Sequence, residues 1–323
     1  MIRIRGASPE PPAATRCDIV SHVIFPLVVP FDTNGGMKQE LKDLLDLLDL
    51  EQIEVNMFRG VSPDEGWQRV YGGQVIGQAL VAASRTVEDE SRTAHSLHGY
   101  FLRPGDTTIP ILYTVDRIRD GRSFTTRRVI AVQKGRAIFS MSVSFQVAEI
   151  GLEHQFDAPE VPGPEQCMSE AELHEKFAND IPEEFQERVH RPKPLEMRFV
   201  EPWNEYNPEP MDPEQHVWMK TVDTMPEDVR LNQCLLAYAS DMTLIDTSYR
   251  PHAIGWGNDK FQVASLDHAM WFHKPMRMDE WLLYQQDSPF SGGARGFSRG
   301  TIFNAAGELV ASVAQEGLIR LHK

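Results

Sequence analysis

An ordered similarity between two halves of the 323-residue chain constrains its fold more than any other feature. The segments YFLRPG, DGRSFTTRR and KGRAIFSMSVSF return in the same order as WFHKPM, GARGFSRG and AGELVASVAQEG. Matching segments lie about 171 to 173 residues apart along the chain. We therefore expect a two-unit internal repeat, in which each unit combines a helix with an antiparallel sheet.

In the first half, Gly72 and Gly73 stand before an apolar, alanine-rich helix that we expect over residues 74–86. A glycine pair at this point permits tight packing and unusual backbone angles. Strand-like stretches follow over residues 94–102, 110–133 and 136–148, and the last has alternating apolar residues. These are Ala137, Phe139, Met141, Val143, Phe145 and Val147. One helix followed by antiparallel strands predicts an α+β layer with the helix lying on the sheet.

The second half repeats this order, with a helix expected over residues 231–246 and strands over 261–275, 280–289, 293–307 and 308–323. Residues 151–195 are rich in proline and acidic residues, which is typical of a linker, with a short helix within 169–179. Residues 1–36 are predicted to be a disordered extension, and translation is expected to begin at Met37. The expected units are therefore 37–150 and 196–323, joined by the linker 151–195.

Composition excludes several classes of partner. The chain carries 32 basic and 47 acidic residues, a formal charge of -15, which argues against nucleic acid or an anionic membrane. Cys17, Cys167 and Cys234 are far apart and odd in number, which favours a reducing compartment. No apolar run approaches the ~20 residues needed to span a bilayer.

Two polar residues occupy positions where the helix and strand periodicity predicts apolar side chains. Asp241 belongs to the stripe that Cys234, Ala237, Tyr238, Leu244 and Ile245 form on the helix expected from CLLAYASDMTLI. Gln315 lies on the inward parity of the last strand, where the first unit has Val143. Burying such groups without partners costs several kcal/mol, on the order of 2–7. Either each has a structural partner of its own, or the two satisfy each other or a ligand.

Other motifs are weaker. The histidines lack the spacing of a zinc site, and the adjacent Asp267 and His268 are expected to be structural. There is no G-x-S-x-G, no P-loop and no G-x-G-x-x-G. Arg122 and Arg295 occupy matching arginine-rich segments, which indicates either solvated strand edges or contacts to the phosphates of a nucleotide-bearing substrate.

Nine motifs together resemble the acyl-CoA thioesterase II family (TesB-type) over residues 37–323. They are YGGQVIGQAL, HGYFLRPGD, DGRSFTTRRV, SVSFQ, YASDMTLI, LDHAMWFHKP, EWLLY, ARGFSRG and QEGLIR. The resemblance implies an α+β double hotdog, two repeats each with a long helix packed on a curved antiparallel sheet. It also implies hydrolysis of medium- to long-chain fatty acyl-CoA without metal or cofactor, and a homo-oligomer, with a tetramer favoured. With the scattered cysteines, we expect a cytoplasmic location.

The resemblance places the catalytic residues on Asp241, Ser265 and Gln315, all in the second unit. Many bacterial members carry Thr where this chain has Ser265. A carboxylate in apolar surroundings gains basicity, so we expect Asp241 to activate a water that attacks the thioester directly. Gly72, Gly73 and Gln74 of the other unit are expected to contact the substrate as oxyanion donors, and Arg122 and Arg295 to bind it elsewhere.

Two other functions remain open at this stage. Enoyl-CoA hydratases with the same fold use an Asp and a His a few residues apart in one loop, whereas Asp267 and His268 are adjacent on an expected strand. A non-catalytic acyl-CoA binder or a structural repeat protein would have no use for a buried carboxylate.

Overall fold

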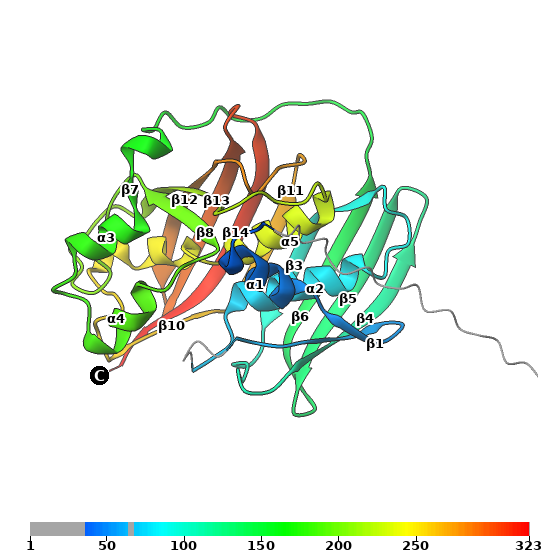
Figure 1. The fold of residues 1–323 in the computed structure, drawn as a ribbon, viewed down its shortest axis with the longest axis horizontal. Helices are drawn as coiled ribbons and strands as arrows, with labels where there is room; N and C mark the ends of the chain where they lie inside the picture. Colours follow the sequence, from blue (N-terminus) through cyan, green and yellow to red (C-terminus); the bar gives the residue numbers. More distant parts are fainter. Residues whose placement is uncertain (1–35, 64–67, 323) are drawn as a thin grey trace, which may run out of the picture.

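A computed structural model describes residues 36–63 and 68–322 of the chain (Figure 1). The predicted extension over residues 1–36 lies outside the described residues except for Gly36. Within the described part, all strands join one 14-stranded sheet whose ladders are antiparallel, and helices cover part of it. The expected combination of antiparallel sheet and few helices is confirmed.

The first unit follows the expected order. The amphipathic segment after Met37 forms a helix whose four buried leucines (Leu41, Leu44, Leu45 and Leu48) share one face. The elements are α1 (Gln39–Leu48), β1 (Glu51–Glu54), β2 (Met57–Gly60), α2 (Gly72–Ser84), β3 (Arg92–Phe101), β4 (Ile111–Asp120), β5 (Phe124–Gln133) and β6 (Arg136–Val147). On β6 the predicted alternation is confirmed over its middle, where Phe139, Met141, Val143 and Phe145 are buried.

The second unit contains the expected helix and strands together with elements that the sequence reasoning missed. The missed strands, β7, β8 and β9, precede α5, and β8 pairs with both of the others. The elements are η1 (Pro164–Gln166), β7 (Met168–Ser169), α3 (Glu170–Lys176), α4 (Glu183–Val189), β8 (Leu195–Phe199), β9 (Glu214–Thr221), α5 (Val229–Ala239), η2 (Leu244–Ser248), η3 (Arg250–His252), β10 (Phe261–Ser265), β11 (Asp267–Phe272), β12 (Leu282–Gly292), β13 (Arg295–Asn304) and β14 (Leu309–Leu321).

The two units meet at the pairing of β3 with β11, which we call the seam. Away from the seam the order is β6, β5, β4, β2, β1 on one side and β14, β13, β12, β9, β8, β7 on the other, and β10 also pairs with β14. At the seam His98 pairs with Ala269, its counterpart 171 residues later. The pairs Ser96–Trp271 and Tyr100–Asp267 are then exchanged by the same 171-residue shift. The repeat read from the sequence is therefore expressed as a local two-fold relation about the seam.

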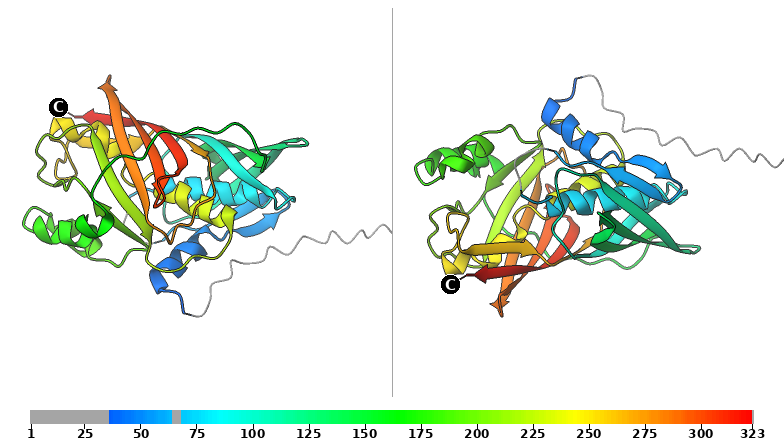
Figure 2. Two further views of the ribbon diagram at one scale, coloured as in Figure 1. Left: turned by 90° about the horizontal axis from the view of Figure 1, so that it is seen from above. Right: turned by 90° about the horizontal axis from the view of Figure 1, so that it is seen from below.

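Helices α2 and α5, one from each unit, lie side by side in the middle of the molecule (Figures 1 and 2). Their close approach depends on glycine, because a Cβ on Gly73 would lie 2.2 Å from the Tyr238 carbonyl oxygen. A Cβ on Gly77 would lie 3.2 Å from the Cys234 carbonyl oxygen. Every residue of α2 after Gly72 is buried, so this helix is the centre of the core.

The helix boundaries differ from the prediction. Helix α2 begins at Gly72, so the glycine pair forms its first turn instead of preceding it. Helix α5 ends at Ala239 instead of continuing to residue 246, and Asp241 lies in the turn that follows. In this turn Ser240 Oγ lies 3.0 Å from the Ala237 carbonyl oxygen and 2.9 Å from His268 Nε2, and the backbone of α2 binds the Asp241 carboxylate.

The predicted linker is more ordered than expected. Its expected short helix is confirmed as α3, where Ser169 and Glu172 form a capping box. A second helix, α4, was not predicted. Residues 151–163 contain no helix or strand and run as a strap along the second half of the sheet. Gln155 of the strap bonds to Gly307 and Leu309, and Pro162 accepts a bond from Trp218.

Candidate active site

Three side chains predicted to be catalytic meet around one carboxylate oxygen. Gln315 Nε2 donates to Asp241 Oδ1 at 2.5 Å and to Ser265 Oγ at 2.8 Å, and Ser265 Oγ donates to the same Oδ1 at 3.2 Å. The residues come from β14, from the turn after α5 and from the last position of β10. Strand pairing places Ser265 opposite Gly317, two residues after Gln315 on the same face of β14, so the pairing of β10 with β14 brings Ser265 and Gln315 together.

Asp241 is held by the first unit as well. The backbone N–H of Gly73 donates to its carboxylate, and a Cβ on Gly72 would lie 2.5 Å from Oδ2. The carboxylate therefore occupies the positive end of the α2 dipole. Burial raises the pKa of Asp241 to about 6, against the hydrogen bonds from Gln315, Ser265 and Gly73, which lower it. A carboxylate with this pKa can accept a proton near neutral pH and release it again.

Gln315 is 1% exposed, and its Oε1 has no hydrogen-bond partner within the described residues. Buried amide oxygens are rarely left unpaired, so Gln315 Oε1 has the capacity to accept a further hydrogen bond beside the carboxylate. A water that donates one proton to Asp241 and the other to Gln315 Oε1 would direct a lone pair away from both.

The residues expected to bind substrate do not all lie at the Asp241 carboxylate. The backbone N–H of Gly73 donates to the Asp241 carboxylate, and its expected role as an oxyanion donor stays a prediction. The Gln74 side chain donates to Val61 O and Ser62 Oγ. Arg122 is exposed, and Arg295 is exposed and paired with Glu316 at 2.8 Å. No recorded contact of the described residues links either arginine to Asp241, and their role in binding stays a prediction.

Sequence reasoning missed three residues around Asp241. Tyr71 donates to the Tyr238 carbonyl and Tyr284 donates to the Ser240 carbonyl, and both bonds fix the turn that carries the carboxylate. His268 is fully buried beside them. The repeat could have found His268, because residue 97, its counterpart 171 positions earlier, is a leucine.

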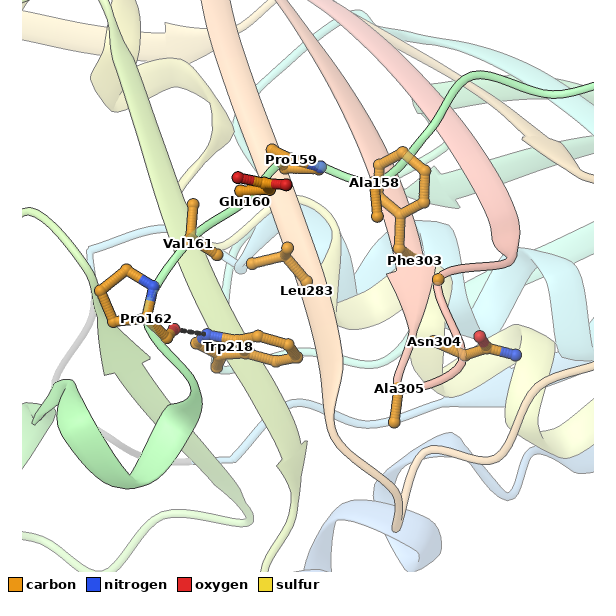
Figure 3. A pocket seen from close by; sticks show the side chains of 11 residues that line it. Ala158, Pro159, Glu160, Val161, Pro162, Trp218, Leu283, Phe303, Asn304 and Ala305 are labelled. Atoms are coloured by element: carbon orange, nitrogen blue, oxygen red, sulfur yellow. Dashed lines mark hydrogen bonds between the residues drawn. The ribbon is translucent and has the colours of Figure 1, made fainter.

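A surface pocket beneath the strap lies elsewhere (Figure 3). Ala158, Val161, Trp218, Leu283 and Phe303 are among its lining residues. Leu283 has the opposite parity on β12 to Tyr284, whose hydroxyl reaches Ser240 after α5. Since alternate residues of a strand point to opposite faces, this pocket opens on the other side of the sheet from Asp241.

Three further features concern metal ligands, cysteines and membrane-spanning helices. In residues 36–63 and 68–322, no group of three or more His, Cys, Asp or Glu is arranged to hold a metal ion. Cys167 and Cys234 are free and buried, and Cys17 lies outside the described residues. None of the described helices is long and apolar enough to cross a bilayer.

Known proteins match this arrangement over most of the chain. The family model for acyl-CoA thioesterase matches residues 186–318, and the model for the acyl-CoA thioesterase N-terminal domain matches residues 63–146. Acyl-CoA thioesterase 2 of Haemophilus influenzae is 42% identical over 88% of this chain and 99% of its own length. The chain belongs to the acyl-CoA thioesterase family. It is an acyl-CoA hydrolase, as the resemblance predicted.

Two further relatives extend the comparison. Human acyl-coenzyme A thioesterase 8 is 38% identical over 90% of this chain and 92% of its own length. The crystal structure of acyl-CoA thioesterase II TesB2 from Mycobacterium marinum is 44% identical, with a TM-score of 0.70 over 85% of this chain and 97% of that one. A hot dog fold protein from Alicyclobacillus acidocaldarius, at 16% identity and a TM-score of 0.69 over 86% of this thioesterase and 98% of that chain, shows the fold alone.

Proposed function

We propose that this thioesterase hydrolyses medium- to long-chain fatty acyl-CoA by direct attack of a water that Asp241 activates. The observation that carries the proposal is the convergence of Gln315 and Ser265 on the Asp241 carboxylate, deep in the protein. Gln315 and Ser265 orient the base, and Gln315 Oε1 accepts the second proton of the water.

The reaction balances with these groups alone. The water oxygen forms a bond to the thioester carbon while its proton passes to Asp241. The tetrahedral intermediate then expels sulfur, the C–S bond breaks, and Asp241 returns the proton to the CoA thiolate. The products are a free fatty acid and CoA, and Asp241 ends ionised as it began.

Ser265 serves as a donor in this scheme and forms no acyl-enzyme. Its hydroxyl already donates to Asp241 and accepts from Gln315, so it is held as part of the cluster. The test is mass spectrometry of the enzyme quenched during turnover of an acyl-CoA. We expect no acyl adduct, and a covalent adduct on Ser265 would overturn direct attack. Asp241→Ala, Ser265→Ala and Gln315→Ala should each cut turnover strongly while the protein stays folded.

Chain length follows from the apolar surroundings of the cluster. Met242 packs against the core, and Ile245 lies over Gly317, where an added Cβ would come within 1.9 Å of its Cδ1. These side chains make the surroundings of the cluster apolar, which suits an acyl tail, and the channel that holds the tail is part of the proposal. Hydrolysis rates across a series of acyl-CoAs test this, and a maximum at acetyl-CoA would contradict it.

The finer architecture is also part of the proposal. We assign a double hotdog in which α2 and α5 are the long helices of the two units, with the base on the second. Its support is the reversal of strand order about the seam. A homo-oligomer, favoured as a tetramer, and a cytoplasmic location complete the proposal, the latter supported by the free Cys167 and Cys234. Sedimentation velocity tests the assembly.

The hydratase alternative is disfavoured by the directions of its two residues. The Asp267 carboxylate accepts from the backbone of Glu316, whereas His268 points to Ser240 near α5. Adjacent strand residues face opposite sides of the sheet, so the pair cannot act on one substrate atom. Free thiol release from acyl-CoAs, measured beside hydration of enoyl-CoA, separates a thioesterase, a hydratase and a non-catalytic binder.

A further inference from the structure

His268 is a polar residue in the core of the catalytic unit where the other unit has hydrocarbon. It lies on β11, and the residue 171 positions earlier, on β3, is Leu97. Both side chains are fully buried. Since a buried imidazole costs free energy that a leucine does not, its presence in one unit only indicates a role specific to that unit.

The imidazole joins Ser240 to Asp241. Its Nε2 lies 2.9 Å from Ser240 Oγ, and its Nδ1 lies 3.8 Å from Asp241 Oδ1. Nδ1 is buried and has no hydrogen-bond partner within the described residues. Burial lowers the pKa of His268 to about 3, so the ring is neutral and carries a single N–H at working pH.

The position of that single proton follows from the neighbours. An ionised carboxylate attracts an N–H and repels a lone pair, so Asp241 favours the tautomer with the proton on Nδ1. The single hydroxyl proton of Ser240 has two acceptors within reach, the Ala237 carbonyl oxygen at 3.0 Å and His268 Nε2 at 2.9 Å, and in this tautomer it is donated to the bare Nε2. A shift of less than 1 Å, on the order of ordinary side-chain motion, would bring Nδ1 and Asp241 into hydrogen-bond distance.

We propose that His268 is a positioning residue, whose Nδ1–H faces Asp241 and keeps this carboxylate ionised and oriented for proton transfer. The proposal rests on the assignment of Asp241 as the base. His268 touches neither water nor substrate in this scheme, and acts through the carboxylate. Gln315, Ser265 and Gly73 supply the direct donors, and His268 adds a fourth, whose Nδ1 lies nearest to Oδ1.

Other titratable groups face Asp241 from the elements packed around it. Tyr71 lies just before α2, Tyr284 on β12 and Asp246 on η2. Both phenols donate to backbone carbonyls, and Asp246 accepts from Tyr249. Their hydrogen bonds are thus directed elsewhere, and His268 is the group among these four whose ring N–H can turn to the carboxylate.

Three substitutions separate a donor from a space-filling role. His268→Leu installs the residue of the other unit. His268→Asn places an amide N–H near the position of Nδ1, and His268→Gln places one near Nε2. For His268→Leu we expect kcat to fall about tenfold or more and the acid limb of the kcat/KM pH profile to move up by about one unit. His268→Asn should restore the limb toward the wild-type position, and His268→Gln should not.

Two NMR readouts do not depend on activity. The ¹⁵N shifts of the wild-type His268 ring should show the proton on Nδ1, and the ¹³C titration of the Asp241 carboxyl should move to higher pH in His268→Leu. A proton on Nε2, or an Asp241 titration unchanged in His268→Leu, overturns the proposal. If those NMR results hold while Asp241→Asn keeps full activity, the error lies in the assignment of the base instead.

Discussion

The two units share a backbone frame but differ at one corresponding place in each. In the second unit this place holds the Asp241 carboxylate and the polar residues around it, whereas in the first unit the matching strand positions hold hydrocarbon side chains. The positions of Ser265, His268 and Gln315 correspond, 171 or 172 residues earlier, to Ala94, Leu97 and Val143. The strand irregularity next to Ser265 recurs next to Ala94, which supports the correspondence.

In the first unit, side chains from α5 of the second unit occupy the corresponding region. Arg230, from α5, donates to the carbonyl oxygens of Ser84, Val87, Asp89 and Arg92. Gln233 bonds both the N–H and the carbonyl of Ala94. In the other direction, Gly73 of the first unit binds Asp241 of the second. Each unit therefore supplies hydrogen-bonding groups to the other. Among the described residues of the two corresponding regions, it is the second unit that has a buried acceptor without a partner, Gln315 Oε1, beside a carboxylate, Asp241.

The largest effect should follow from removing the base. Asp241→Asn keeps the size of the side chain but cannot accept a proton, and we expect kcat to fall about 10³-fold. Thiol release from an acyl-CoA measures it. The matched control is Asp246→Asn, which neutralises another buried carboxylate of the same unit and should stay within a few-fold of wild type. Equal losses in both variants would remove the special role of Asp241.

The next effect tests the bond between the units. Gly73→Ala places a Cβ 2.2 Å from the Tyr238 carbonyl oxygen, so α2 must move away from Asp241. We expect a loss of about 1–3 kcal/mol in the free energy of unfolding, together with a drop in kcat. Gly151→Ala, where an added Cβ meets nothing within 4 Å, is the control. Unchanged kcat in Gly73→Ala would show that this backbone donor is dispensable.

Removing the guanidinium of Arg230, which binds the carbonyl oxygens of the first unit, should lower the free energy of unfolding and leave kcat nearly unchanged. Arg230→Met deprives four carbonyl oxygens of their donor, and we expect a loss of about 2–4 kcal/mol by chemical denaturation. The exposed Arg136→Met should cost little. A large fall in kcat at full stability would mean that the first place takes part in catalysis.

A smaller effect concerns stability against pH. The folded state raises the pKa of Asp241 from 3.8 to about 6, so it binds this proton more tightly than the unfolded chain. The favourable contribution is present below pH 3.8 and is lost as pH rises through about 6. Asp241→Asn should therefore be more stable than wild type at pH 8, by about 2–3 kcal/mol, and equal to it near pH 3. Thermal melts at the two pH values decide this.

The smallest expected effect is at the exposed arginines. If Arg122 and Arg295 contact CoA phosphates, Arg122→Ser and Arg295→Ser should raise KM about two- to fivefold, with kcat unchanged and the effect weaker in high salt. The exposed Arg128→Ser, whose partner is Asp116, is the control. If KM is the same in all four proteins, the solvated-edge interpretation of these segments holds.

Periodicity and repetition predicted most of the sheet, because alternating burial is a local property of β3 to β6 and β11 to β14. Strands β8 and β9 were missed because EMRF and QHVWMK are short and lie in charged, proline-rich surroundings. The end of α5 could not be predicted, since Ser240 and Asp241 have partners 24 to 74 residues away in sequence.

The site was predictable only where it broke a pattern. Asp241 and Gln315 stood out as polar residues among apolar ones, and Ser265 followed from the family resemblance alone. His268 was set aside because it was compared with zinc and hydratase motifs, and not with Leu97. The donation from Gly73 depends on the packing of α2 against α5, which no local sequence signal reports.

The seam between β3 and β11 affects how the molecule unfolds. Because it lies inside a continuous sheet, neither unit can open without exposing a hydrogen-bonded edge of the other. The most slowly exchanging amide hydrogens should therefore lie along the seam, and denaturant should unfold both units in one transition. A repeat unit that shares its sheet with a second unit can lack a catalytic site of its own, because the second unit still requires it in order to fold.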